Sequence, residues 1–242
     1  MYFQKQLNCG KKYIGMNKVT QFVSYEKMSK YVANIIEDIF KKSFRMSFPK
    51  LVLPTGSTPL GLYEELVKRQ LDWSNITTFN LDEYIINPNH LQSYYNFMRM
   101  NLFDKTNIYP NSYNFPDRNT QAYEDKIEEH GGIDLCILGI GTNGHIAFNE
   151  PDTSFESRTR VVDLSDQTIK DNSRFFDTEQ DVPRQAITMG LGTIMESEKI
   201  VLMANGVNKL NILNVAMNGE VTESVPASIL QNHDNVKVYY CD

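Results

Sequence analysis

The chain has 242 residues, of which 41% are hydrophobic and 22% are charged, and its formal net charge is -6. It contains no low-complexity tract, internal repeat or Pro/Gly/Ser-rich linker, so we expect a globular chain that folds as one domain. The negative charge argues against a broad basic surface for nucleic acid or anionic membranes, so any anionic ligand must be held by local groups.

Short β-rich runs alternate with longer amphipathic segments, an order that predicts parallel strands joined by crossover helices. In chain order, the predicted elements are a strand at 19–23, a helix at 25–45, a strand at 50–53, a helix at 59–69, a strand at 76–80, helices at 93–103 and 121–130, strands at 133–138, 159–163, 186–189 and 199–204, a helix at 207–217 and a strand at 236–240. Apolar residues recur at helical spacing in the first helix, and we expect this stripe to cover the sheet. We therefore predict a single three-layer α/β/α domain with a mostly parallel sheet.

Three cysteines, Cys9, Cys136 and Cys241, lie far apart in the chain. Their odd number and spacing favour free or buried thiols in a reducing compartment over a disulfide framework or a metal site. No apolar stretch reaches the roughly 18 residues of a membrane span, and the N-terminus lacks the pattern of a signal peptide, so we expect a cytoplasmic protein. Residues 1–15 do not join the pattern of elements and are interpreted as an N-terminal extension of a domain at 16–242.

The most informative stretch of the chain follows the predicted strand at 133–138. A glycine-rich loop at 139–144 can bring backbone N–H groups close to a ligand, because glycine tolerates positive φ and has no side chain in the way. His145 and Glu150 follow this loop. A histidine titrates near neutral pH and a carboxylate can hold its ring, so the stretch predicts a site that moves protons on a bound small molecule.

Four loops are expected to meet at one edge of the sheet, because ligands bind outside the carboxyl ends of parallel strands. These loops follow Leu53, Asn80, Leu138 and Ala204. The first begins with Pro-Thr-Gly-Ser-Thr-Pro at 54–59 and opens a helix, where hydroxyls and free N–H groups form a natural phosphate cradle. The candidate phosphate ligands are Thr55, Gly56, Ser57 and Thr58. The alternative is that Ser57 or Thr58 merely caps the helix.

Charged residues in the other loops also allow two interpretations. Asp82 and Glu83 end a strand that is otherwise expected to be buried, and they fit either a solvated or turn-capping loop or a general base aimed at the ligand. Lys209 lies in the first turn of a predicted helix, where the helix dipole disfavours a cation unless an anion is bound. Arg174 is either a second phosphate ligand or a solvated surface arginine.

In these segments the chain resembles a known family, the glucosamine-6-phosphate deaminases, also called glucosamine-6-phosphate isomerases. The shared motifs are LPTGSTP at 53–59, FNLDEY at 79–84, GIGTNGHIAFNEP at 139–151, SRTR at 157–160, NSRFF at 172–176, and Lys209. The resemblance spans nearly everything from Met16 onward. It implies a Rossmann-like fold and a hydrolytic conversion of glucosamine 6-phosphate and water to fructose 6-phosphate and ammonia, in N-acetylglucosamine catabolism, without a metal or organic cofactor.

The resemblance also implies a role for each candidate residue. Asp82 would be the base that moves a proton between C2 and C1 of the opened sugar. His145 would open the ring, with Asn143 and Glu150 orienting and polarising the imidazole. The 6-phosphate would be held by Thr55, Gly56, Ser57, Thr58, Arg174 and Lys209.

Two departures from the family pattern modify this expectation. Some members carry aspartate where this chain, like other members, has Asn143, so Glu150 must supply the negative charge beside the imidazole alone. Regulated hexameric members carry a basic residue two positions after the arginine equivalent to Arg160, and they have a C-terminal extension. Here that position is Val162 and the sequence ends at Asp242. We therefore expect a monomer that is not activated by N-acetylglucosamine 6-phosphate.

Two other functions fit the pattern less well. The 6-phosphogluconolactonases share a Gly-x-Gly-x-x-Gly-His loop, but lactone hydrolysis needs no carbon base such as Asp82. A sugar-phosphate-sensing regulator would use a similar domain, but the sequence contains no DNA-binding helix-turn-helix or basic arm, and a sensor does not need Asp82 together with His145.

Overall fold

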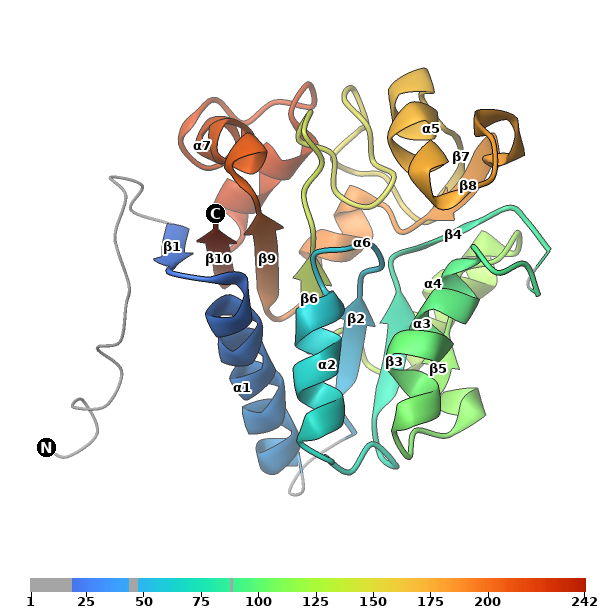
Figure 1. Ribbon diagram of the computed structural model, residues 1–242, viewed down its shortest axis with the longest axis vertical. Coiled ribbons are helices and arrows are strands. Elements are labelled where there is room, and N and C mark those ends of the chain that lie inside the picture. The colour runs from blue at the N-terminus through green and yellow to red at the C-terminus, as the bar shows by residue number, and fades with distance from the viewer. Residues whose placement is uncertain (1–18, 44–47, 88) are drawn as a thin grey trace, which may run out of the picture.

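The computed structural model describes residues 19–43, 48–87 and 89–242 (Figure 1). Among these residues, seven strands form the main sheet, and every pairing within it is parallel. In sheet order, the strands are β1 (Val19–Phe22), β10 (Val236–Cys241), β9 (Ile200–Asn205), β6 (Leu135–Leu138), β2 (Lys50–Leu53), β3 (Thr77–Asn80) and β5 (Tyr113–Asn114). The predicted extension at 1–15, with Cys9, lies outside the described residues.

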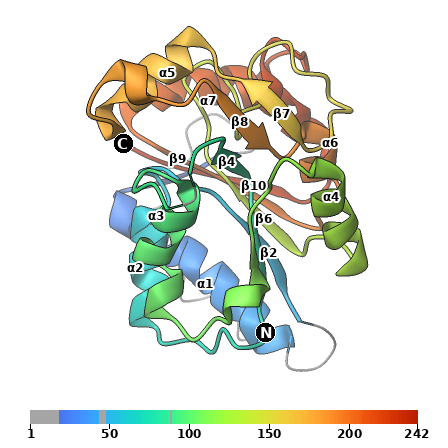
Figure 2. The same cartoon turned by 90° about the vertical axis from the view of Figure 1, so that its right-hand side faces the viewer.

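Helices cover both faces of this sheet, as Figures 1 and 2 show. One face packs against α1 (Tyr25–Ser43), α2 (Leu60–Lys68) and α3 (Tyr94–Asn101). The other packs against α4 (Thr120–Glu129), α6 (Leu191–Met195), α7 (Leu210–Asn218) and the 3₁₀ segment η6 (Pro226–Asn232). The two faces alternate along each strand, so that Leu51 and Leu53 lie in the first core and Val52 in the second. The predicted three-layer domain with a mostly parallel sheet is confirmed.

A second, smaller sheet lies beyond the carboxyl ends of the main strands (Figure 1). In the described part of the chain it has three antiparallel strands, in the order β4 (Asp82–Tyr84), β8 (Gln185–Thr188) and β7 (Arg160–Asp163). A separate core joins this sheet to α5 (Asp166–Asn172) through Tyr84, Leu164 and Ile169.

The expectation that the strands at 159–163 and 186–189 run parallel to the others is therefore wrong. A parallel connection needs a crossover that packs on the sheet, usually a helix, whereas the seven-residue α5 and short 3₁₀ turns lead the chain back antiparallel. The burial of β7 alternates between half-buried and exposed positions, which is typical of an antiparallel strand with one solvated face.

The other predicted elements are present, and their ends lie within two residues of those expected wherever the structure describes them, except that the helix predicted at 207–217 begins three residues later, as α7 (Leu210–Asn218), after the 3₁₀ turn η5 (Val207–Lys209). The predicted end of the first helix, Arg45, lies outside the described residues. Among the strands and α-helices of the described residues, four were not predicted, namely β4, β5, α5 and α6. Cys136 and Cys241 are buried free thiols, as expected. No helix in the described part of the chain is long and apolar enough to cross a membrane.

Candidate active site

The site is positioned by a reversal in the order of the main sheet. From β2 the chain continues outward to β3 and β5, whereas β6 lies on the opposite side of β2. The segments that leave β2 and β6 therefore diverge from a topological switch point, where open parallel sheets bind their ligands. Asp82 follows β3, the strand on the other side of β2, and the loop predicted after Ala204 leaves β9, which lies beside β6. All four predicted loops therefore leave adjacent strands.

The glycine loop after β6 lets His145 fold back onto its own backbone. The N–H of Gly141 donates to the carbonyl of His145 at 2.9 Å, which closes the loop. A Cβ at Gly141 would lie 2.2 Å from Cε1 of the His145 ring, so any side chain there would displace the imidazole. Gly144 has a φ of 89°, in the left-handed region that favours glycine. These glycines thus fix the position of the histidine that follows them.

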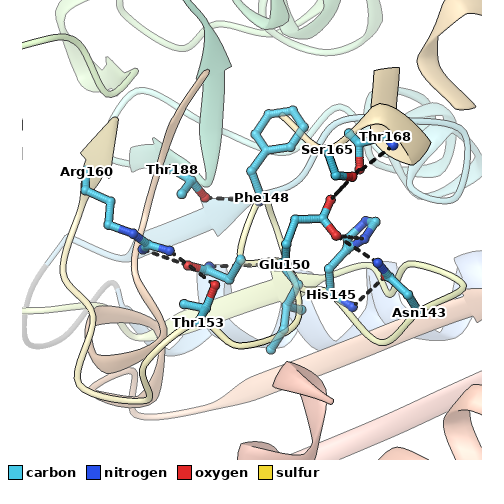
Figure 3. Close-up of polar contacts among 11 residues, drawn as sticks. Asn143, His145, Phe148, Glu150, Thr153, Arg160, Ser165, Thr168 and Thr188 are labelled. Atoms are coloured by element: carbon cyan, nitrogen blue, oxygen red, sulfur yellow. Dashed lines mark hydrogen bonds and ion pairs between the residues drawn. The ribbon is translucent and has the colours of Figure 1, made fainter. Parts of the chain in front are cut away.

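Glu150 is the centre of a hydrogen-bonded group around this histidine (Figure 3). The Nδ2 amide of Asn143 donates to Oε2 of Glu150 at 2.7 Å, and Oδ1 of Asn143 accepts from the backbone N–H of His145 at 3.2 Å. Nδ1 of His145 is buried and lies 3.7 Å from the same Oε2, a distance for an ion pair rather than a hydrogen bond. The Glu150 carboxylate therefore faces the imidazole, while the Asn143 amide links that carboxylate to the backbone of His145.

Two further partners of Glu150 come from α5 and were not predicted. The hydroxyl of Thr168 donates to Oε1 of Glu150, and the hydroxyl of Ser165 lies 3.3 Å from the same oxygen (Figure 3). Burial raises the pKa of Glu150, but His145, Thr168 and Asn143 outweigh it and lower the value to about 2. Ser165 is the N-cap of α5. A serine in front of a short polar run was the available signal, but α5 lacks the apolar periodicity that reveals longer helices.

Asp82 lies at the point where the chain passes from the main sheet to the second sheet. It is the first residue of β4, pairs with Thr188 of β8, and is only 7% exposed. The interpretation of Asp82 as a solvated loop residue is therefore wrong. Burial and, next, the nearby charge of Glu83 raise the pKa of its carboxyl to about 8. A carboxyl that titrates near neutral pH at a strand end can both take and return a proton.

The segment at 54–59 runs between β2 and α2. Gly56 adopts a φ of 93°, and Pro59 is the N-cap of α2 without any side-chain cap, so the capping role considered for Ser57 and Thr58 is wrong. The hydroxyl of Tyr25 takes that role: it accepts from the N–H of Gly61 at 2.7 Å and donates to the carbonyl of Thr58 at 2.8 Å.

The two predicted cations lie in segments beyond the same edge of the sheet (Figure 1). Lys209 ends the 3₁₀ turn η5 (Val207–Lys209), which follows β9 and leads directly into α7. Arg174 lies in η3 (Ser173–Phe175), after α5, is exposed, and places its guanidinium carbon 4.7 Å from the centroid of the Phe175 ring.

The fold defines the class of protein: it is a doubly wound α/β protein, a class whose small-molecule sites lie at the switch point of the sheet. The family model "Glucosamine-6-phosphate isomerases/6-phosphogluconolactonase" matches residues 23–239, and the chain belongs to this family.

Within this family, the chain is more similar in sequence to glucosamine-6-phosphate deaminases than to the solved 6-phosphogluconolactonase described below. A glucosamine-6-phosphate deaminase of Thermoanaerobacter sp. (strain X514) is 46% identical over 235 residues, which are 91% of each chain. One from Clostridium novyi (strain NT) is 45% identical over 232 residues, 90% of this chain and 95% of the relative. A solved monomeric glucosamine-6-phosphate deaminase is 37% identical with a TM-score of 0.88, over 93% of this chain and 97% of its own. A 6-phosphogluconolactonase from Trypanosoma cruzi, 22% identical with a TM-score of 0.76, shares the fold over 93% of this chain and 94% of its own.

Proposed function

We propose that this protein is a glucosamine-6-phosphate deaminase, which converts glucosamine 6-phosphate and water to fructose 6-phosphate and ammonia in amino-sugar catabolism. One observation carries the proposal: a buried carboxyl, Asp82, with a pKa of about 8, and a separate histidine–carboxylate pair, His145 and Glu150, follow the two strands that flank β2, namely β3 and β6. The reaction needs these two parts, because the sugar ring must open before a proton can be taken from C2. The relatives that are 43–46% identical carry the same name.

His145 opens the ring in this proposal. Its imidazole passes the proton of the C1 hydroxyl to the ring oxygen, which frees the C1 aldehyde and leaves the ring oxygen as a hydroxyl on C5. The carboxylate of Glu150 stabilises the protonated imidazole during the transfer, and Asn143 holds this carboxylate and the backbone of His145 through its two hydrogen bonds. Glu150 suits this role because it stays ionised at neutral pH.

Asp82 moves the carbon-bound proton. Its carboxylate takes the proton from C2 while a proton of the substrate's own ammonium group passes to the C1 oxygen, which gives an enolamine, and Asp82 then returns its proton to C1. The imine so formed at C2 adds water and loses ammonia, leaving the ketone of fructose 6-phosphate. These steps are proton transfers, so the protein supplies acids, bases and position rather than a metal or organic cofactor.

The 6-phosphate is assigned to the opposite end of the sugar. Backbone N–H groups and hydroxyls of the segment at 54–59 bind it, through Thr55, Gly56, Ser57 and Thr58, with positive charge from Arg174 and Lys209. Binding energy from this group, which does not react, fixes C1 and C2 against the base. An anion beside Lys209 also accounts for a cation at the start of α7.

The test is a direct assay of the two products. Wild-type protein incubated with glucosamine 6-phosphate should release ammonia and fructose 6-phosphate in equal amounts, and Asp82→Asn should lose nearly all turnover while still folding. Incubation with 6-phosphogluconolactone tests the related activity. Lactone hydrolysis without ammonia release would overturn the proposal, and normal turnover by Asp82→Asn would overturn the assignment of the base.

We further propose a cytoplasmic monomer whose partner is the sugar phosphate, with no nucleic acid, membrane or N-acetylglucosamine 6-phosphate effector. The solved relative with a TM-score of 0.88 is a monomeric deaminase, which supports this state. Light scattering should give a mass near 27.9 kDa. Substrate titrations should be hyperbolic with and without the effector, and a sigmoidal curve relieved by it would contradict the proposal.

A further inference from the structure

Glu83, the residue after Asp82, joins strand β4 to the start of helix α3. Its Oε1 accepts the backbone N–H groups of Tyr84 and Tyr94, and its Oε2 accepts that of Tyr95, each at 2.8 Å. Ser93, the N-cap of α3, accepts the next N–H of the helix, that of Asn96, at 3.2 Å. A carboxylate from a neighbouring strand therefore satisfies two of the N–H groups that a helix start leaves without an intrahelical partner.

This contact fixes a strand that is otherwise weakly held. β4 has three residues and lies at one end of the order β4-β8-β7, so only β8 pairs with it. Successive side chains of a strand point to opposite faces, so Glu83 reaches α3 on one side while Asp82 points to the other. Movement of Glu83 away from α3 would move the backbone that carries Asp82.

The same contact holds the negatively charged carboxylate of Glu83 at the start of α3, one residue after Asp82. Three N–H donors converge on two oxygens, an arrangement that suits the carboxylate ion, and the N-terminal end of the α3 dipole favours negative charge. Burial raises the pKa of Glu83, and these three hydrogen bonds oppose that rise.

In the described part of the chain, four tyrosines lie close enough to Asp82 for its charge to act on their phenols. They are Tyr63 of α2, Tyr84 of β4, Tyr94 of α3 and Tyr123 of α4. Burial raises the pKa of each phenol above its ordinary value of 10, so none of them changes charge near neutral pH. Within this group, Glu83 is the residue whose negative charge raises the pKa of Asp82.

We propose that Glu83 is a positioning residue for Asp82: it anchors β4 to the N-terminus of α3 and supplies a fixed negative charge that strengthens the hold of Asp82 on a proton. The anchor sets where the base stands, and the charge sets how strong a base it is. This inference rests on the proposed function, because it is read out through the proton transfer assigned to Asp82.

Three variants separate the charge from the anchor. Glu83→Gln removes the charge and replaces one acceptor oxygen with a donor that faces an N–H group. Glu83→Asp keeps the charge but shortens the reach to α3. Ser93→Ala removes the other cap of the same helix start and leaves the charge of Glu83 in place.

The measurement is kcat and KM across pH for ammonia release. The acid limb of kcat reports the loss of the proton from Asp82, so Glu83→Gln should move this limb to lower pH by about half a unit or more. Its kcat at the optimum should fall about tenfold, with KM changed much less. Glu83→Asp should lower kcat without moving the limb, and Ser93→Ala should leave the limb unchanged.

Each other outcome counts against the inference. An unmoved limb in Glu83→Gln, or an equal movement in Ser93→Ala, would overturn it. If Glu83→Gln does not fold, Glu83→Asp tests the inference instead. An unchanged kcat in that variant would show that Glu83 does not position Asp82. If the wild type releases no ammonia, the proposed function fails instead. The charge is then tested without substrate, by ¹³C NMR titration of the Asp82 carboxyl, which should lose its proton at lower pH in Glu83→Gln than in the wild type.

Discussion

The side-chain amide of Asn143 donates a 2.7 Å hydrogen bond to Oε2 of Glu150, the same oxygen that lies 3.7 Å from Nδ1 of His145. The amide and the imidazole therefore share one carboxylate oxygen, and the amide holds it at the shorter distance. A neutral group at position 143 orients the pair without adding charge, so the protonated imidazole depends on Glu150 for electrostatic stabilisation.

Replacement of Asn143 by aspartate should change this balance. An aspartate adds a second negative charge near the ring and loses the amide donor to Glu150, so the protonated form of His145 becomes more stable. If ring opening starts from the neutral imidazole, the protein remains active and the acid limb of kcat/KM moves to higher pH. The pH profile of ammonia release tests this, and an unchanged limb would remove the proposed role of Asn143.

Loss of the hydroxyl of Thr168 should weaken the fold in a pH-dependent way. Thr168→Val keeps the shape but removes a hydrogen bond to Glu150, so the pKa of Glu150 should rise from about 2 toward its ordinary value of 4.5. A lowered pKa stabilises the folded state above the unfolded value, and this contribution is lost as the pH falls through the folded value. The variant should therefore be less stable by about 1–2 kcal/mol at pH 7, and the difference should disappear near pH 2.

Urea unfolding at several pH values measures this difference. Thr168→Ser keeps the hydroxyl and is the matched control. It loses only a methyl group at a buried position, so its cost should not vary with pH. A constant difference for Thr168→Val across the acid range would show that the hydrogen bond does not stabilise the ionised carboxylate.

Most strands of the main sheet could be predicted, because they depend on local signals. Buried apolar runs such as 50–53 and 133–138 end at proline or glycine, and both strands appear where expected. The second sheet could not be predicted, because β4 consists of Asp-Glu-Tyr and pairs with β8 in the far half of the chain. Three residues with two acids carry no strand pattern, and only tertiary pairing makes them a strand.

In the candidate site, too, local contacts could be predicted and long-range contacts could not. Asn143, His145 and Glu150 occur within eight consecutive residues, and their hydrogen bonds are local. The contact of Thr168 with Glu150 depends on how α5 packs over the second sheet, and no sequence spacing reports it.

A side chain at Gly141 should impair catalysis more than folding. In Gly141→Ala the new Cβ would lie 2.2 Å from the imidazole, so His145 must turn away from its place beside Glu150. Misplacement of a catalytic group by about 1 Å costs roughly a hundredfold, and we expect a loss of kcat of that size. Inhibition by inorganic phosphate is the control, because the segment at 54–59 leaves another strand. An equal loss of phosphate affinity would mean that the whole edge had been disturbed.

Replacement of Asp82 by asparagine should abolish turnover but stabilise the fold. The folded-state pKa of Asp82, about 8, lies above its ordinary value of 3.8, because burial and Glu83 disfavour the charged form. The contribution of Asp82 to folding stability is therefore complete below about pH 4 and is lost as the pH rises through 8. Asparagine carries no charge, so the Tm of Asp82→Asn should exceed that of the wild type by a few degrees at pH 8, with no difference at pH 4.

Thermal unfolding across this pH range tests the prediction, with Asp104→Asn as the control. Asp104 is exposed and forms a surface ion pair with Arg99 at 2.9 Å, so its replacement should change stability by less than about 1 kcal/mol. A gain for Asp82→Asn that grows between pH 4 and 8 would show that the fold gives up stability to keep a protonatable carboxyl at the end of β3. If the two variants behaved alike, the charge of Asp82 would cost the fold nothing, and its raised pKa would have no support from stability.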